Sequence, residues 1–86
     1  MAKWYIVHGY TGTTEPTQSA DEAWLKFRCV VKRSKRRWQI ECKQQVTGIL
    51  IEATTKRAAK ESNMKHQSGT IGRGTWSVIC RKQIWV

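Results

Sequence analysis

The chain has 86 residues, which is enough for one domain over residues 1–86 and too few for a second. It carries 16 Lys and Arg against 6 Asp and Glu, giving a net charge of +10 at pH 7. A hydrophobic share of 40% with five tryptophans can form one core, which excludes disorder throughout the chain. No apolar run approaches the roughly 18 residues of a membrane-spanning helix, and the first residues lack the pattern of a secretion signal.

The three cysteines, Cys29, Cys42 and Cys80, are widely spaced and odd in number. A secreted domain of this size usually has a denser, even set of cysteines joined in disulfides. We therefore expect a reduced, cytoplasmic protein. Together with His8 and His66, these cysteines also lack the ligand spacing of a zinc site, so we expect no metal and no other cofactor.

The first predicted elements are a strand, a loop and a helix. Residues 3–8 are rich in aromatic and β-branched types, which is typical of a strand, and residues 9–18 carry the only proline of the chain and predict a loop. A helix is expected from Ser19 to about Ser34, because Ser19 and Glu22 have the spacing of a capping box. Apolar residues then recur at helical spacing: Ala20, Ala23, Trp24, Phe27, Val30 and Val31.

The remaining elements follow from alternation and turn signals. Residues 38–43 and 46–53 each have the pattern of a strand, and we expect them to pair in a hairpin. Residues 56–61 predict a short helix. Residues 67–74 hold three glycines and predict a loop, and residues 75–86 predict a long closing strand.

This order of elements predicts the fold class α+β, as a ferredoxin-like βαββαβ sandwich with both helices on one face of a four-stranded antiparallel sheet. Two alternatives stay open. One is a three-stranded sheet plus a C-terminal helix, in which residues 23–31 form a strand. The other is an αβββα arrangement like that of a double-stranded-RNA-binding domain.

The positive charge is concentrated after residue 22. Residues 1–22 hold one basic and three acidic side chains, whereas residues 23–86 hold fifteen basic and three acidic ones. The densest run is Lys32, Arg33, Lys35, Arg36 and Arg37, which we expect on the loop after the first helix. Five cations in six positions exceed what a helix end needs to balance its dipole, and they suit contacts with phosphate oxygens. The alternative is a solvated helix end.

A second cluster is expected on and after the short helix: Lys56, Arg57, Lys60 and Lys65. If both helices share one sheet face, the two clusters merge into one basic stripe. Arg73 lies in the glycine-rich segment of residues 69–74, which could carry it to a ligand. That segment lacks the flanking strand and helix of a nucleotide-binding loop.

Aromatic side chains beside cations can stack on nucleobases. Tyr5 is the favoured candidate, because alternation along its strand turns it away from the face of Trp4. Tyr10, Trp38 and Trp85 are the other candidates. The aromatic residues expected in the core are Trp4, Trp24, Phe27 and Trp76.

Two short resemblances accompany these patterns. The order of elements, with residues 4–7 and 47–51, superficially resembles an RNA recognition motif, although Ile49 and Ile51 stand where that family has aromatic residues. Residues 3–12 are similar to the opening strand of the N-terminal domain of NusG transcription factors, over these residues alone. Neither resemblance assigns the chain to a family.

Two histidines, no carboxylates paired close in sequence and no nucleophile motif give no basis for catalysis, so we do not expect an enzyme. We expect sequence-tolerant binding of DNA or RNA through Lys and Arg contacts with phosphates, in a regulatory role. The alternative is a small inhibitor or adaptor, of the kind that mobile elements encode, which binds an acidic protein surface or a nucleic-acid-handling complex. Its mark would be an apolar patch near the cations, with Leu25 and Ile79 as candidates. Pairing of edge strands would also allow a homodimer.

Overall fold

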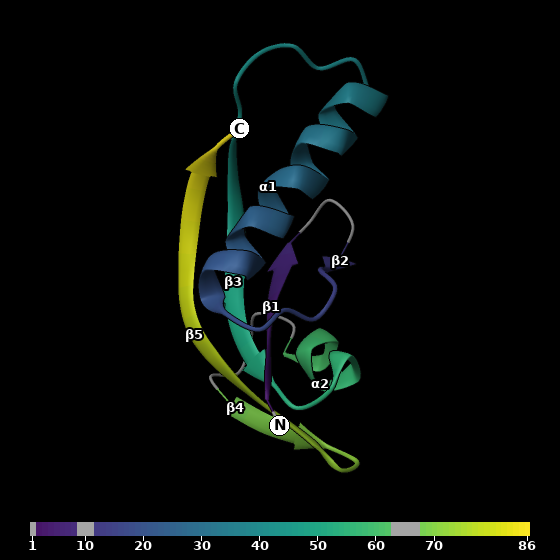
Figure 1. Ribbon diagram of the computed structural model, residues 1–86, viewed down its shortest axis with the longest axis vertical. Helices are drawn as coiled ribbons and strands as arrows, with labels where there is room; N and C mark the ends of the chain where they lie inside the picture. Colours follow the sequence, from purple (N-terminus) through teal and green to yellow (C-terminus); the bar gives the residue numbers. More distant parts are fainter. Residues whose placement is uncertain (1, 9–11, 63–67) are drawn as a thin grey trace.

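A computed structural model describes residues 2–8, 12–62 and 68–86 of the chain. The elements in these ranges are β1 (Lys3–His8), β2 (Gly12–Thr13), α1 (Ala20–Arg37), β3 (Gln45–Ala53), α2 (Lys56–Glu61), β4 (Ser68–Ile71) and β5 (Gly74–Trp85). The strands form one curled antiparallel sheet in the order β2-β1-β3-β5-β4 (Figure 1). The α+β class is confirmed, and the molecule is elongated, with extents of 41 × 24 × 18 Å.

The predicted hairpin between residues 38–43 and 46–53 is wrong. Residues 38–43 form no strand, and both Trp38 and Cys42 are exposed. The strand β3 pairs instead with β5 along its whole length and with β1 over residues 48–53, so its edges are occupied by these two partners. The described order is therefore ββαβαββ, and the ferredoxin-like order is not confirmed.

The predicted loop over residues 67–74 is also wrong in its described part. Ser68–Ile71 is the strand β4, which pairs with the first residues of β5. Gly72 and Arg73 form the two-residue turn between them, and Gly72 has a φ of 56°. A glycine at the first position of such a turn is favoured because other residues rarely adopt this conformation.

The helix α1 begins where the capping signal predicts. The Ser19 hydroxyl accepts a hydrogen bond from the Glu22 backbone N–H at 3.2 Å, and the Glu22 carboxylate accepts one from the Gln18 backbone N–H at 3.1 Å. These bonds satisfy N–H groups that have no partner inside the first turn. The alternating-strand interpretation of residues 23–31 is therefore wrong.

The helix ends three residues later than expected, at Arg37. Lys and Arg have high helix propensity, so the basic run continues the helix instead of leaving it. The helix stops in a Schellman motif, in which the Gln39 N–H donates to the Arg36 carbonyl at 3.2 Å and the Ile40 N–H donates to the Lys35 carbonyl at 2.8 Å. Gln39 adopts a φ of 57°, in the left-handed region that glycine usually fills.

One face of the sheet packs against α1, and Phe27 lies fully buried at its centre. The other buried members of this α1 core are Ile6, Ala23, Val31, Val46, Leu50 and Ile84, and Trp24 packs against them half-buried. Gly48 of β3 lies directly beneath the helix. A Cβ there would come within 2.9 Å of Phe27 Cε2, Trp24 Cζ3 and Ile6 Cγ2, so a glycine is what lets α1 approach the sheet so closely.

The opposite face packs against α2 and holds a separate α2 core: Tyr5, Ile49, Ile51, Ala53, Ala58, Ala59 and Trp76. Because successive residues of a strand point to opposite faces, Tyr5 and Ile6 belong to different cores. The expectation that both helices share one sheet face is therefore wrong. With six residues, α2 covers only part of its face.

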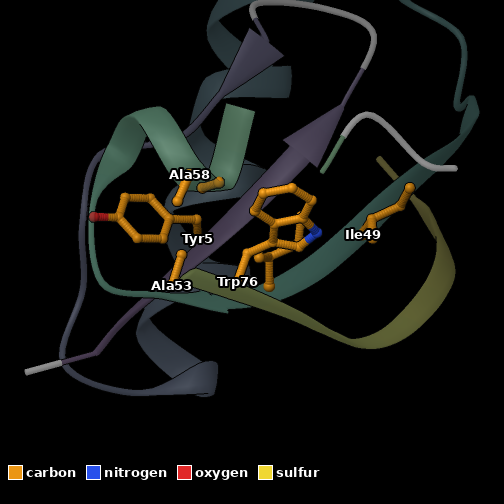
Figure 2. Packing of buried hydrophobic residues seen from close by; sticks show 7 residues of the cluster. Tyr5, Ile49, Ala53, Ala58 and Trp76 are labelled. Atoms are coloured by element: carbon orange, nitrogen blue, oxygen red, sulfur yellow. The ribbon is translucent and has the colours of Figure 1, made fainter. Parts of the chain in front are cut away.

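Tyr5 is not an exposed stacking residue, which corrects the sequence expectation. Its side chain is 2% exposed. Figure 2 shows its ring between Ala58 and Ala53, in the same cluster as Trp76, with its hydroxyl pointing away from that cluster. Burial raises the pKa of Tyr5 above 10.0, while the nearby Lys56 opposes this shift. The alternation that was interpreted as an exposed face instead marks a second core.

Candidate nucleic-acid interface

All five cations of the basic run lie in the C-terminal half of α1, where the sequence predicted a loop. A helix turns by about 100° per residue, so neighbouring cations in the run point in different directions. Residues four apart share a side of the helix. The helical geometry therefore divides the run into groups with different surroundings.

Arg33 and Arg37 form one such pair and line a groove beside the helix. Lys32 and Arg36 form another, and both are exposed on the outer side of α1. Lys35 differs from the other four, because its ammonium group donates a hydrogen bond to the backbone oxygen of Val86. This hydrogen bond attaches the helix to Val86, the residue that follows β5. The other four cations are exposed and can therefore bind a ligand.

The groove has a volume of about 660 Å³ and runs along the β2 edge of the sheet. Its walls come from α1, from α2 and from the residues at and just after β2. The lining residues are Thr13, Thr14, Glu15, Val30, Arg33, Ser34, Arg37 and Lys56. Lys56 of the second predicted cluster thus meets Arg33 and Arg37 of the first here, around the sheet edge rather than on a shared face.

Glu15 is the carboxylate among these lining residues, and it is already paired. Lys56 Nζ lies 2.8 Å from Glu15 Oε1 in a solvent-exposed hydrogen-bonded ion pair. This hydrogen bond and the charge of Lys56 lower the pKa of Glu15 below 4.5, and the charges of Lys26 and Lys60 act in the same direction. Among the described lining residues, three cations face one carboxylate, which leaves this part of the groove net positive.

A smaller hollow of about 320 Å³ continues the groove toward the middle of α1. Its wall combines the cations Lys26 and Arg33 with apolar atoms of Leu25, Cys29 and Val30. Leu25 is 63% exposed and is continuous with the apolar atoms of Cys29 and Val30 in this wall. The positive groove is therefore bordered by an apolar patch.

The other predicted site residues lie apart from this groove or beside it. Arg57 and Lys60 are exposed on α2, the helix that supplies Lys56. Arg73 is at the tip of the β4–β5 turn, at the opposite end of the long axis from the C-terminus of α1 (Figure 1). Lys65 and Tyr10 lie outside the described residues, as does His66.

Two residues of this region were missed by the sequence analysis, Glu15 and Lys26. Lys26 could have been found, because it stands seven residues before Arg33, two helical turns away on the same side of α1. The sequence analysis expected Arg33 on the loop after the helix, which hid this relation. Glu15 carries no comparable local signal, since only the fold brings it to Lys56.

In the described part of the chain, the cysteines and acidic residues show no arrangement for metal binding. Cys29, Cys42 and Cys80 are all free and exposed. Within residues 2–8, 12–62 and 68–86, no three His, Cys, Asp or Glu side chains gather into a group that could hold a metal ion. Over the same ranges, no helix is both long and apolar enough to cross a membrane.

Comparison with known proteins gives no relative for this chain: no family model matches it, and neither do the curated proteins or the solved structures searched. Its function is therefore argued from the groove and the charges around it.

Proposed function

We propose that this chain binds nucleic acid through its phosphate groups, with the groove between α1 and α2 as the primary contact. The observation that carries this proposal is the convergence of Arg33, Arg37 and Lys56 from two helices on one groove whose described lining has a single carboxylate. Guanidinium groups can contact phosphate oxygens in a bidentate manner, and an ammonium group adds a point charge. Such contacts do not read base identity, so binding is tolerant of sequence.

The outer pair of cations extends this surface. Lys32 and Arg36 lie on the same helical turns as Arg33 and Arg37 and are exposed to solvent. A polyanion lying across the C-terminal half of α1 would therefore meet cations on both sides of the helix axis. Contacts at several phosphates add to affinity and make it strongly dependent on salt.

Glu15 should weaken the binding of phosphate by Lys56. Because it is paired with Lys56, an incoming phosphate competes with the carboxylate for the same ammonium group. Replacing Glu15 with Gln removes this competitor and should tighten binding at low salt. An exposed ion pair contributes about 0–1 kcal/mol to folding, so the Glu15→Gln variant should still fold.

The proposal is tested with protein freed of bound nucleic acid, titrated with short single- and double-stranded DNA and RNA at several salt concentrations. We expect binding that weakens linearly on a logarithmic salt scale, with little difference between unrelated sequences of one type. Tighter binding of the Glu15→Gln variant would support the groove as the site. No binding to any of the four nucleic acids at low salt would refute the proposal.

A second candidate function is supported by the apolar patch of Leu25, Cys29 and Val30 beside Lys26 and Arg33. An exposed apolar patch bordered by cations suits an acidic protein surface with apolar residues of its own. In that case the chain would act as a small inhibitor or adaptor. The same titration separates the two functions, because this one requires no affinity for nucleic acid.

A further inference from the structure

The half of the α2 face that α2 leaves uncovered presents a row of exposed side chains on two paired strands. They are Gln45 and Thr47 of β3 and Arg81, Gln83 and Trp85 of β5. Val46 and Ile84, which alternate with them, are buried in the α1 core. The row therefore lies on the sheet face opposite α1, beyond the reach of the short helix α2.

Trp85 is the outstanding member of this row. Its side chain is 61% exposed, although it belongs to a strand and pairs with Gln45. Elsewhere on the same face, where α2 packs on the sheet, the aromatic residues of the α2 core are buried. An exposed indole on an open sheet face offers a flat surface of the kind on which a nucleobase can stack.

The residues beside Trp85 fit an extended polyanion. Gln83 and Arg81 are two and four positions before it on the same face, at intervals of about 7 Å along the strand. The Gln83 side-chain N–H donates a hydrogen bond to the Thr47 hydroxyl at 3.5 Å, which leaves the side-chain oxygen of Gln83 to accept a hydrogen bond from another donor. Of the two cations of β5, Arg81 lies on this face, whereas Lys82 lies on the α1 face with its Nζ 5.4 Å from the ring centre of Trp24. Neither β5 nor residues 45–51 of β3 carry an acidic residue.

This surface lies at the end of the molecule where α1 ends and its basic run lies, although on the opposite face of the sheet. The C-terminal end of β5, which Trp85 completes, and the C-terminal turn of α1 lie at the same end of the long axis (Figure 1), where Lys35 donates a hydrogen bond to the Val86 oxygen. A strand held by its phosphates at the basic end of α1 could thus place a base near the indole. In a duplex the bases are already stacked on one another, so only a single strand offers a free base.

We propose that Trp85, on the open face of β5 that also carries Arg81, is a stacking site for a base of single-stranded nucleic acid. This inference rests on the proposed phosphate binding, which supplies most of the affinity. It adds a preference for single strands over duplexes that phosphate contacts alone do not give.

The test compares Trp85→Ala with Trp38→Ala, a matched loss of another exposed tryptophan, which is 72% exposed at the end of α1. The probes are a labelled oligothymidylate, an abasic strand with the same backbone, and a duplex. We expect Trp85→Ala to weaken oligothymidylate binding about tenfold, with unchanged affinity for the abasic strand and the duplex. Trp85→Phe should restore most of the loss, and Trp38→Ala should leave all three affinities near those of the parent.

The outcomes separate this site from the proposed function. If Trp85→Ala binds the oligothymidylate as tightly as the parent, the stacking site is refuted while phosphate binding stands. An equal loss on all three probes, with an unchanged melting temperature, also refutes stacking, because the abasic strand has no base to lose. If the parent protein binds none of the probes, both proposals fall together.

Discussion

The two faces of the sheet differ in how they are covered, although the same strands supply both. The 18-residue helix α1 packs along one face and buries Phe27, Ile6 and Val31 completely. The six-residue helix α2 covers part of the other face, and the row that ends in Trp85 stays exposed. The face that α1 covers therefore mainly forms a core, whereas the face that α2 covers has a small core and an exposed surface.

This difference shows why a small basic domain can fold and still present binding surfaces. The α1 core uses the inner side of the helix, so the outer side is open to solvent and carries Lys32 and Arg36. The groove cations come from that outer side and from α2, at the edge where the two faces meet. Changes in the α1 core should therefore affect folding, whereas changes on the open face or in the groove should affect binding.

The largest expected effect is the loss of Phe27. Phe27→Ala removes the largest fully buried side chain of the molecule as described and should destabilise it by about 3–5 kcal/mol. A matched change on the open face, Gln83→Ala, should alter stability by no more than about 0.5 kcal/mol. Urea denaturation followed by circular dichroism measures both, and equal effects would contradict the division between the faces.

A smaller loss is expected at Gly48, where α1 approaches the sheet. Gly48→Ala places a Cβ about 2.9 Å from side-chain atoms of Phe27, Trp24 and Ile6, so these side chains or the helix must shift. Overpacking of this kind costs roughly 1–3 kcal/mol. The neighbouring Thr47→Ala on the open face is the control. A Gly48→Ala variant as stable as the parent would show that α1 can shift away from the sheet without cost.

A gain in stability is expected at the other end of the same helix. Gln39 has a left-handed backbone conformation that glycine adopts without strain, so Gln39→Gly should stabilise the protein by about 1 kcal/mol. The rise should appear as a higher melting temperature. If Gln39→Gly lowers the melting temperature instead, the side chain of Gln39 contributes more than its backbone strain costs.

The two faces should also respond differently to pH. Burial lowers the pKa of His8, whose ring lies 4.9 Å from that of Phe27 in the α1 face, whereas Tyr5 on the opposite face titrates above pH 10. The unfolded chain therefore takes up the His8 proton before the folded one does. The contribution of His8 to the free energy of unfolding should be fully present above the unfolded pKa of about 6.5. It should be lost as the pH falls below that value.

Thermal unfolding between pH 8 and pH 5 tests this dependence. The His8→Gln variant should show a flatter profile, whatever its absolute stability. The Glu15–Lys56 pair does not interfere, because the contribution of Glu15 is lost only below pH 4.5. An identical pH profile in parent and variant would show that His8 is not the group responsible.

The parts of the fold that the sequence predicts correctly are those with local signals. Ser19 and Glu22 fix the start of α1, and the spacing of Ala23, Phe27 and Val31 identifies its buried side. The end of α1 was missed because Gln39, not glycine, occupies the terminating position. The strand β4 was missed because four residues that include Gly69 resemble a loop until β5 pairs with them.

The candidate site was predicted in its composition and not in its geometry. The basic run and Lys56 were identified from charge, but their meeting depends on the position of β2 between the two helices. Tyr5 was assigned to an exposed face because alternation cannot distinguish an open face from one covered by a second helix. Which half of that face is open depends on the length of α2, and this is why Trp85 is a better candidate than Tyr5.

The central claim is that the groove on α1, and not net charge alone, binds phosphate. Arg37→Gln and Arg73→Gln test it directly, since each removes one arginine and leaves the same net charge, 10 − 1 = +9. Arg37 lines the groove, and Arg73 is at the far end of the molecule. We expect Arg37→Gln to weaken binding to all nucleic acids and reduce the salt slope by about one, with Arg73→Gln close to the parent. Equal salt slopes and affinities for the two variants would contradict the claim.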